Sequence, residues 1–336
     1  MKNIIKELCR GILVCCIIPA LMIGFVVAAG GLGADGVQTQ PTVPTLPQLN
    51  VTAPLTPEHT ETSPPISEPI MISVIVDGQR QEMPLEAYIL CVVLGEMPAD
   101  FETEALKAQA VVARTYTAKI VEGSRHNGGV CTKSSCCQAY CDAQEYLGKG
   151  GTEEKLQKVR SAVEATAGQV LTYEGQLITA TYFSCSGGST EDAAAVWGYD
   201  VPYLQSVKSP GEEASAAYSR EKTFTPEEFR KKMAVRLKGK PETWFGKVTY
   251  TEGGGVETIC IGGVSYRGTT IRSLLGLRST MFTVQVEDGQ IVFRTKGYGH
   301  RVGMSQYGAD AMALAGSSYE QILAHYYTGT VLTNIH

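Results

Sequence analysis

The pattern of apolar residues divides the chain into three parts. Residues 12–29 carry no charge and are almost wholly apolar, whereas residues 31–69 are rich in Thr and Pro and show no apolar periodicity. An apolar run of this length can cross roughly 30 Å of hydrocarbon, and a Thr- and Pro-rich segment buries too little surface to fold. We therefore expect a cytoplasmic stub and transmembrane anchor over residues 1–30, a disordered linker over 31–69 and a folded domain over 70–336.

The charges that flank the apolar run indicate its orientation. Lys2, Lys6 and Arg10 precede it. Positive charge stays on the cytoplasmic side of a membrane, so the folded domain should lie outside the cytoplasm. A cleaved signal peptide is the alternative, but its apolar region usually has only about 7 to 15 residues. The length of the run favours an uncleaved anchor.

Beyond the linker, helical and strand-like periods are mixed. Apolar steps of three and four residues predict helices over 84–94, 103–121, 153–166, 226–237 and 317–326. Alternating and β-branched segments predict strands over 70–76, 177–184, 247–251, 256–261, 282–287 and 290–295, the last two joined by an Asp-Gly turn. This mixture is typical of an α+β fold, in which residues 225–277 could form a small lobe. The net charge of −5 argues against a general nucleic-acid binder.

Glu96 is the first candidate for chemistry. Pro98 disfavours helical backbone at Met97, so the helix over 84–94 should end just before the acid. The negative end of the helix dipole and the apolar neighbours Met97 and Phe101 both favour the protonated carboxyl. Glu96 is therefore a candidate general acid.

Two cations lie on the helix that follows. Lys107 and Arg114 are seven residues apart on one helical face and could point toward Glu96. The alternative is that both belong to a solvated face and that Glu96 is an ordinary surface acid.

A cluster of metal-binding residue types follows that helix. His126, Cys131, Cys136, Cys137 and Cys141 fall within sixteen residues of a Gly- and Ser-rich loop. Zinc takes four thiolate or imidazole ligands in a tetrahedral arrangement, but outside the membrane disulfides also persist. Spacing alone leaves both chemistries open. A disulfide between Cys185 and Cys260 is equally undecided.

A Ser-Gly-Gly segment follows the strand expected over 177–184. Gly187 and Gly188 permit a tight turn and close approach of backbone N–H groups to a ligand, and Ser184 and Ser186 offer hydroxyls. A plain turn is the alternative. Ser186 as an acyl-transfer nucleophile is disfavoured because the Gly-x-Ser-x-Gly elbow is absent.

Three blocks of the chain resemble the stage II sporulation protein D family of cell-wall enzymes. They are Glu-Met-Pro-Ala with the helix that ends Ala-Arg-Thr-Tyr (96–116), Ser-Cys-Ser-Gly-Gly-Ser-Thr-Glu through Pro-Tyr-Leu (184–204), and Gly-Tyr-Gly-His-Arg-Val-Gly-Met-Ser-Gln-Tyr-Gly-Ala (297–309). The match runs from about residue 74 to 332. It implies a lytic transglycosylase with a glycan-binding cleft that acts on peptidoglycan strands stripped of stem peptides by an amidase partner. It also implies a role in engulfment during sporulation, at the mother-cell membrane facing the intermembrane space, with other engulfment membrane proteins as further partners.

The resemblance also suggests a zinc site. The family's zinc segment typically ends His-Cys-Gln-Ala-Tyr, where this chain has Cys-Cys-Gln-Ala-Tyr over 136–140. A thiolate can replace an imidazole, so the expected ligands are His126, Cys131, Cys136 and Cys137, with Cys141 as the substitute. A filled set of four ligands implies one structural ion, since catalytic zinc keeps an open position.

The expected substrate contacts are Lys107, Arg114, Ser184, Ser186, Tyr203 and Gln306. Lys107 and Arg114 would position the strand or hold Glu96. Trp197 and Tyr203 could stack on a sugar or belong to the core. Gln306 is favoured over His300 for glycan contact, and a structural histidine is the equal alternative for His300.

A single acid suffices when the substrate supplies the nucleophile. Glu96 would protonate the glycosidic oxygen and then take the proton of the C6 hydroxyl of N-acetylmuramic acid, which closes a 1,6-anhydro ring. A hydrolase would need a second carboxylate, for which Asp192 and Glu191 are the candidates. The alternative function is a non-catalytic wall-binding protein that activates an N-acetylmuramoyl-L-alanine amidase.

Overall fold

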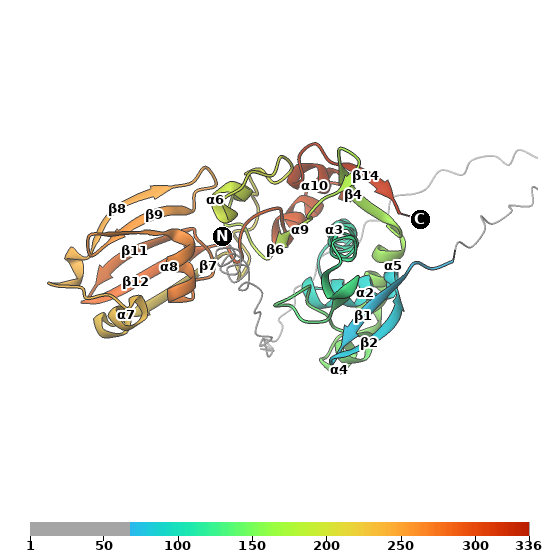
Figure 1. Ribbon diagram of the computed structural model, residues 1–336, viewed down its shortest axis with the longest axis horizontal. Coiled ribbons are helices and arrows are strands. Elements are labelled where there is room, and N and C mark those ends of the chain that lie inside the picture. Colours follow the sequence, from blue (N-terminus) through green and yellow to red (C-terminus); the bar gives the residue numbers. More distant parts are fainter. Residues whose placement is uncertain (1–67, 336) are drawn as a thin grey trace, which may run out of the picture. The chain divides into compact units, whose positions relative to one another are not determined.

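The structured part of the chain contains two hydrophobic cores, which define two lobes. The computed structural model describes residues 68–335, and from Pro69 onward they belong to one compact unit. The first lobe surrounds helix α3 (Thr103–Glu122), whose Ala-rich sequence lets its neighbours approach closely. Those neighbours are α2 (Leu85–Glu96), α5 (Glu153–Glu164), α9 (Gln306–Leu314) and α10 (Tyr319–Tyr326) (Figure 1).

Three small sheets complete the first lobe. Strand β1 (Met71–Val76) lies between antiparallel β2 (Gln79–Pro84) and parallel β3 (Gly129–Cys131). The second sheet has the order β14-β4-β5, with strands Val331–Asn334, Gln169–Tyr173 and Gln176–Leu177, and the third pairs β6 (Tyr182–Phe183) with β13 (Met304–Ser305). The short helices are η1 (Arg125–Asn127), α4 (Ala143–Gly148) and α6 (Ala193–Trp197).

The second lobe spans residues 219–296 and has an aromatic core. Phe229 packs against Trp244 and Phe293, with ring centroids 6.0 and 6.1 Å away. One sheet has the order β10-β9-β8 and the other β11-β12-β7. Their elements are β7 (Ser219–Phe224), α7 (Pro226–Met233), η2 (Pro241–Thr243), β8 (Phe245–Tyr250), β9 (Val256–Ile261), β10 (Val264–Arg267), α8 (Gly268–Leu275), β11 (Phe282–Glu287) and β12 (Gln290–Lys296).

The α+β mixture with antiparallel sheets agrees with the sequence prediction, but three boundaries differ. The strand expected over 177–184 is split into β5 and β6. The helix expected over 226–237 ends at Met233, because Ala234 adopts a left-handed conformation with φ of +52°. The second lobe extends beyond 225–277 because β7 pairs with β12. The predicted Asp288-Gly289 hairpin joins β11 and β12, and both turn residues have positive φ.

The expected membrane anchor and linker precede most of the residues that the structure describes. Within residues 68–335, none of them combines the length and the apolarity needed to cross a bilayer. The anchor expected over 1–30, and all but the end of the linker expected over 31–69, lie outside the described residues.

A buried ion pair joins the second lobe to the first. Arg301 and Glu191 are almost completely enclosed, and Nη1 of the arginine lies 2.9 Å from Oε1 of the glutamate. Arg301 Nη2 donates to the carbonyl of Gly253, and the Gly255 N–H donates to the Glu191 carboxylate. Both glycines belong to the loop between β8 and β9, so the pair fixes this loop against the Ser-Gly-Gly segment.

Removing one partner of this pair should strongly destabilise the chain. We expect Arg301→Gln to lower the free energy of unfolding by about 3–5 kcal/mol, because Glu191 is left buried without its cation. Urea denaturation of the full-length chain measures the loss. Arg294→Gln, which breaks solvent-exposed pairs with Glu221 and Glu287, is the matched control and should change the midpoint little. Equal midpoints for the two variants would contradict this account.

Candidate active site

Glu96 occupies the end of helix α2. The structure extends this helix through Glu96 itself, beyond the expected end at residue 94, and Met97 then adopts extended backbone with φ of −128°. Pro98 accounts for this ending, because it disfavours helical backbone at the residue before it. The carboxyl group therefore starts from the negative end of the helix dipole.

Glu96 is half-buried, and its carboxyl is hydrogen-bonded. Its Oε1 accepts the backbone N–H of Ala139 at 2.6 Å, and the Tyr182 side chain is a second hydrogen-bonding partner. Burial raises the pKa of Glu96, and the hydrogen bonds from Ala139 and Tyr182 oppose but do not cancel that increase. The expected acid character of Glu96 is thus supported by its surroundings.

Gly95 permits this arrangement. A Cβ at this position would lie 2.7 Å from the backbone N of Tyr140 and 2.9 Å from the carbonyl carbon of Ala139. A second backbone contact, from Cys141 N–H to the Cys91 carbonyl at 2.9 Å, holds the same loop against α2. The loop over 137–141 therefore reaches Glu96 only because a glycine precedes the acid.

Tyr182 connects this loop to helix α3. Its hydroxyl donates to Gln138 Oε1 at 3.0 Å, and Gln138 Nε2 donates to Thr117 Oγ1 at 2.9 Å. Sequence analysis assigned no role to Tyr182. The signal that was present is its position two residues before Ser184, on the face of the expected strand that leads into the Ser-Gly-Gly segment.

Gln306 lies beside Glu96 but binds its backbone carbonyl rather than its carboxyl group. Its Nε2 donates to the Glu96 carbonyl at 3.0 Å and lies 3.5 Å from Gln109 Oε1, while its own side chain is buried. The expected direct glycan contact is therefore corrected to a positioning role. The Gln109 amide nitrogen, also buried, has no hydrogen-bond partner among the described residues.

The two expected cations do not converge on Glu96. Arg114 is completely buried and forms a two-bond ion pair with Glu86, at 2.8 and 2.6 Å. Lys107 pairs with Glu104 at 2.7 Å and lies over the ring of Tyr319. A completely buried guanidinium cannot touch a glycan, so the substrate contact expected of Arg114 is wrong. Lys107 already binds Glu104 and Tyr319, so its contact with substrate stays a prediction.

Ser186 is buried by an acid that the sequence did not reveal. The Glu212 carboxylate accepts hydrogen bonds from the Ser186 hydroxyl at 2.8 Å and the Ser209 hydroxyl at 2.6 Å, as well as from the Ser186 and Gly187 N–H groups and the Cys185 thiol. The substrate contact expected of Ser186 is therefore corrected to a structural role. Nothing in the spacing of Glu212, 26 residues downstream, pointed to this contact.

Ser184 and Tyr203 are more accessible. Ser184 is half-buried, and its carbonyl accepts the Tyr307 N–H at 3.0 Å. The Tyr203 hydroxyl accepts the Thr179 N–H at 3.1 Å, and its ring lies 5.6 Å from that of Tyr173. These contacts show that Tyr203 takes part in the packing of the first lobe. The substrate roles expected of Ser184 and Tyr203 stay predictions.

His300 is a satisfied structural histidine. Its Nδ1 accepts the Val302 N–H at 3.1 Å, and its ring contacts those of Phe183 and Trp197. Burial, together with the nearby charge of Arg272, lowers the pKa of His300 to about 4. The imidazole is therefore neutral at physiological pH.

Neither candidate for a second carboxylate is free. Asp192 caps helix α6 by accepting the Ala195 N–H at 2.6 Å. Glu191 is enclosed in its pair with Arg301, where burial raises its pKa and the guanidinium opposes that increase. The carboxyl group of Glu96 thus has the clearest features of a general acid in the described chain.

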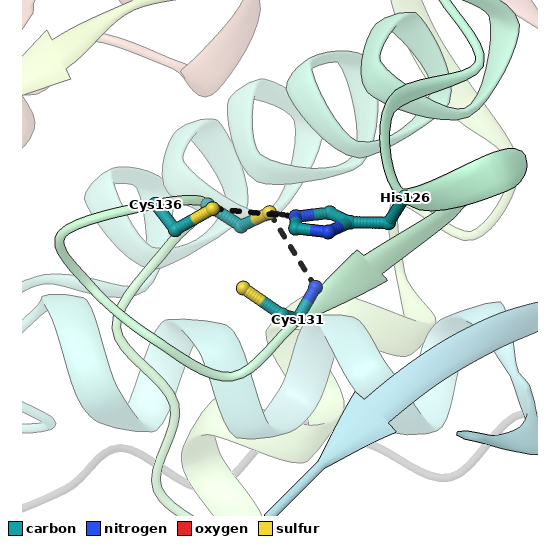
Figure 2. Close-up of side chains that lie close together, drawn as sticks. His126, Cys131 and Cys136 are labelled. Carbon is teal, nitrogen blue, oxygen red and sulfur yellow. Dashed lines mark hydrogen bonds between the residues drawn. The ribbon is translucent and has the colours of Figure 1, made fainter. Parts of the chain in front are cut away.

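The four expected metal ligands converge, and Figure 2 labels three of them, His126, Cys131 and Cys136. The ligand atoms of His126, Cys131, Cys136 and Cys137 all lie within 4.8 Å of one another, and His126 Nε2 is 3.2 Å from the Cys136 sulfur. Ligand atoms around tetrahedral zinc are separated by about 3.5–3.8 Å, so the donor set and its spacing fit that ion. Cys141 lies outside the cluster, and its thiol donates to the Asp142 carbonyl.

Backbone contacts set the ligands in place. The Arg80 side chain donates to the His126 carbonyl, and Arg125 Nη1 donates to the Cys136 carbonyl at 2.9 Å. All cysteines in the described part are free thiols, so a Cys185–Cys260 disulfide is not formed. Cys185 instead donates to Glu212, in the first lobe.

Comparison with known proteins decides the family. The family model described as "Stage II sporulation protein" matches residues 78–173. The chain is 40% identical over 276 residues to the stage II sporulation protein D of Bacillus subtilis (strain 168), covering 80% of each chain. The chain belongs to the stage II sporulation protein D family. Membership in the stage II sporulation protein D family links it to sporulation.

Two further relatives extend this comparison. The stage II sporulation protein D of Bacillus amyloliquefaciens is 40% identical over 279 residues, covering 81% of this chain and 80% of the relative. A Bacillus subtilis (strain 168) protein named amidase enhancer is 32% identical over 297 residues, covering 72% of this chain and 40% of the relative.

The close approach at Gly95 predicts a steric effect. We expect Gly95→Ala to lower the free energy of unfolding by about 1–3 kcal/mol, because the added methyl group displaces the backbone of the loop over 137–141. Gly148→Ala is the matched control: this helical glycine has open space around it, so alanine should stabilise by about 0.5–1 kcal/mol. Urea denaturation measures both, and a neutral or stabilising Gly95→Ala would contradict the contact.

The raised pKa of Glu96 predicts a pH-dependent stability difference. Folding favours the protonated carboxyl, and this contribution is fully present below the unfolded-state pKa and is lost as pH rises through the folded-state pKa. Glu96→Gln cannot ionise, so we expect it to be more stable than the wild type at neutral pH, with a difference that vanishes in acid. Urea denaturation across a pH series measures this, and exposed Glu213→Gln gives the background of a surface exchange. A difference that grows toward acid pH would contradict the assignment.

Proposed function

We propose that this chain is a lytic transglycosylase that cleaves the glycan strands of peptidoglycan between N-acetylmuramic acid and N-acetylglucosamine. The observation that carries the proposal is the half-buried Glu96 carboxyl, held by the Ala139 N–H and with a pKa raised by burial. A general acid must be protonated at working pH, and burial is a common way to achieve this.

Glu96 performs both proton transfers in this mechanism. The protonated carboxyl donates to the glycosidic oxygen as the bond from C1 of N-acetylmuramic acid breaks. The resulting carboxylate then takes the proton of the C6 hydroxyl of the same sugar as that oxygen bonds to C1, which gives a 1,6-anhydro product and regenerates the acid. No water is consumed, so a second carboxylate is not required, in contrast to ordinary glycosidases. The enclosure of Glu191 and the capping role of Asp192 favour this route.

Two residues that do not contact the glycan would support the reaction by holding Glu96 in position. Gln306 donates to the carbonyl of Glu96, and the Tyr182 hydroxyl donates to Gln138, the residue before Ala139. These bonds fix the acid within the tolerance that general acid catalysis needs.

The proposed setting follows from the N-terminal sequence and the family. We infer that residues 12–29 anchor the chain in the mother-cell membrane and that the following linker extends the folded domain into the intermembrane space. An amidase would supply peptide-stripped strands during engulfment. The relative named amidase enhancer favours a second candidate function, in which the chain binds the wall and activates an amidase without cleaving glycan.

We further propose one structural zinc ion held by His126, Cys131, Cys136 and Cys137. A filled set of four ligands leaves no position for water, so the ion would brace the loop rather than take part in chemistry. The last ligand lies two residues before Ala139, whose N–H binds Glu96. Metal binding therefore supports the acid through the backbone.

Ligand substitutions distinguish this set from its alternative. We expect the full-length Cys136→Ser variant to lose the zinc that the wild type carries, as measured by mass spectrometry of the metal, and to melt at a lower temperature because metal binding contributes folding free energy. Cys141→Ser is the matched control and should retain one ion. Loss of metal from Cys141→Ser with retention in Cys136→Ser would contradict the assignment.

The proposed reaction is tested by the ends of its products. Full-length wild type incubated with peptide-free glycan strands should release anhydro-ended products, identified by mass spectrometry. Glu96→Gln should reduce their rate of formation at least about 100-fold, because a general acid contributes that much or more, while Glu213→Gln should retain wild-type activity. Reducing ends would indicate hydrolysis instead, and intact strands with the wild type would favour the non-catalytic function.

A further inference from the structure

An exposed aromatic pair lies at the end of helix α6. Tyr199 is 60% exposed, and its ring stacks on that of Trp197 with centroids 6.2 Å apart and planes 24° apart. Gly198, with φ of +85°, ends the helix between them and turns the chain so that the two rings meet. Within this pair Tyr199 is the exposed ring, whereas Trp197 is partly buried and packs against the core of the first lobe, so Trp197 supports Tyr199 from below.

The pair continues into a row of rings that leads to the proposed acid. Trp197 lies 5.7 Å from the ring of His300, which lies 5.6 Å from that of Phe183. Phe183 directly follows Tyr182, the hydrogen-bonding partner of Glu96. The row of rings therefore runs from the surface at Tyr199 to Phe183, which is the chain neighbour of a residue at the proposed acid.

An arginine of the second lobe lies beside this row. Arg267, at the start of helix α8, donates to the Ala195 carbonyl of helix α6 at 3.0 Å, which holds the two helices together. Arg272 follows on the same helix and is half-buried. Among residues 68–335 no carboxylate forms a salt bridge with Arg272.

These features suit one class of ligand. A hexopyranose presents a flat apolar face that packs on an exposed aromatic ring, and a guanidinium binds a carboxylate through two parallel hydrogen bonds. N-acetylmuramic acid provides both groups once its stem peptide is removed, because hydrolysis of the amide frees the carboxylate of its lactyl ether. With the peptide attached, that carboxylate is absent.

We propose that Tyr199, Trp197 and Arg272 form a saccharide subsite that binds a peptide-free N-acetylmuramic acid unit of the strand, with the sugar on the exposed ring and the lactyl carboxylate on the arginine. This inference rests on the proposed function, since it extends the glycan site away from Glu96. It also gives a physical reason for a preference for stripped strands: Arg272 recognises the group that amidase action creates.

Binding to two ligands tests each part of the subsite. Calorimetric titrations use the full-length chain carrying Glu96→Gln, so that strands are not cleaved during the measurement. The probes are peptide-free glycan strands, which carry lactyl carboxylates, and chitotetraose, which has the same N-acetylated sugar backbone without them. Tyr199→Ala should weaken both ligands about tenfold, and Tyr199→Phe should restore both, because the stack is retained. Arg272→Gln should weaken only the glycan strands, about tenfold.

Matched controls and two outcomes make the test decisive. Tyr250→Ala removes a ring of similar exposure (58%) from strand β8, and Arg236→Gln removes an exposed cation of the same lobe; both should bind like the reference. Unchanged binding by Tyr199→Ala, or an equal loss of both ligands by Arg272→Gln, would overturn the subsite. The expected binding pattern together with a wild type that leaves strands intact would refute the proposed cleavage and leave the subsite standing.

Discussion

The backbone contact between the end of helix α2 and the loop over 137–141 controls the arrangement of the candidate site. It brings the Ala139 N–H to 2.6 Å from the Glu96 carboxyl, and it exists because Gly95 has no Cβ to exclude the loop. The same loop carries the last proposed metal ligand, Cys137, and the amide of Gln138 that binds Tyr182. The environment of Glu96 thus depends on the loop that carries the proposed metal ligands, on the residue at which helix α2 ends, and on strand β6 from a distant part of the sequence.

Several polar residues of the recognisable motifs serve the architecture rather than a ligand. Arg114, Ser186 and Gln306 are buried, and each binds an internal carboxylate or carbonyl. Buried polar groups of this kind are costly to leave unpaired, so their partners must be present for the fold to be stable. Arg301 and Glu191 extend the principle to the junction with the second lobe. Tyr199, by contrast, is exposed.

The sequence was most informative where the determinants are local. Helix periodicity, the effect of Pro98 on helix α2 and the Asp-Gly turn at 288–289 all depend on neighbouring residues, and the convergence of His126 with the cysteines follows from a short loop. Helical spacing placed Lys107 and Arg114 on one face but could not reveal whether that face meets solvent or another element. The pairing of Arg114 with Glu86, 28 residues away, and the burial of Ser186 by Glu212 depend on tertiary packing that no local pattern encodes.

The central claim is that the fold keeps the Glu96 carboxyl protonated above the pH at which an ordinary glutamate ionises. Carbon-13 NMR of the full-length chain labelled at glutamate side-chain carboxyls would measure this directly, with the Glu96 signal assigned by its absence from Glu96→Gln. The account predicts a midpoint clearly above the ordinary value of 4.5, with burial as the dominant cause. A Glu96 signal that titrates at or below that value would contradict the account, because the carboxyl would then be ionised when an acid is needed.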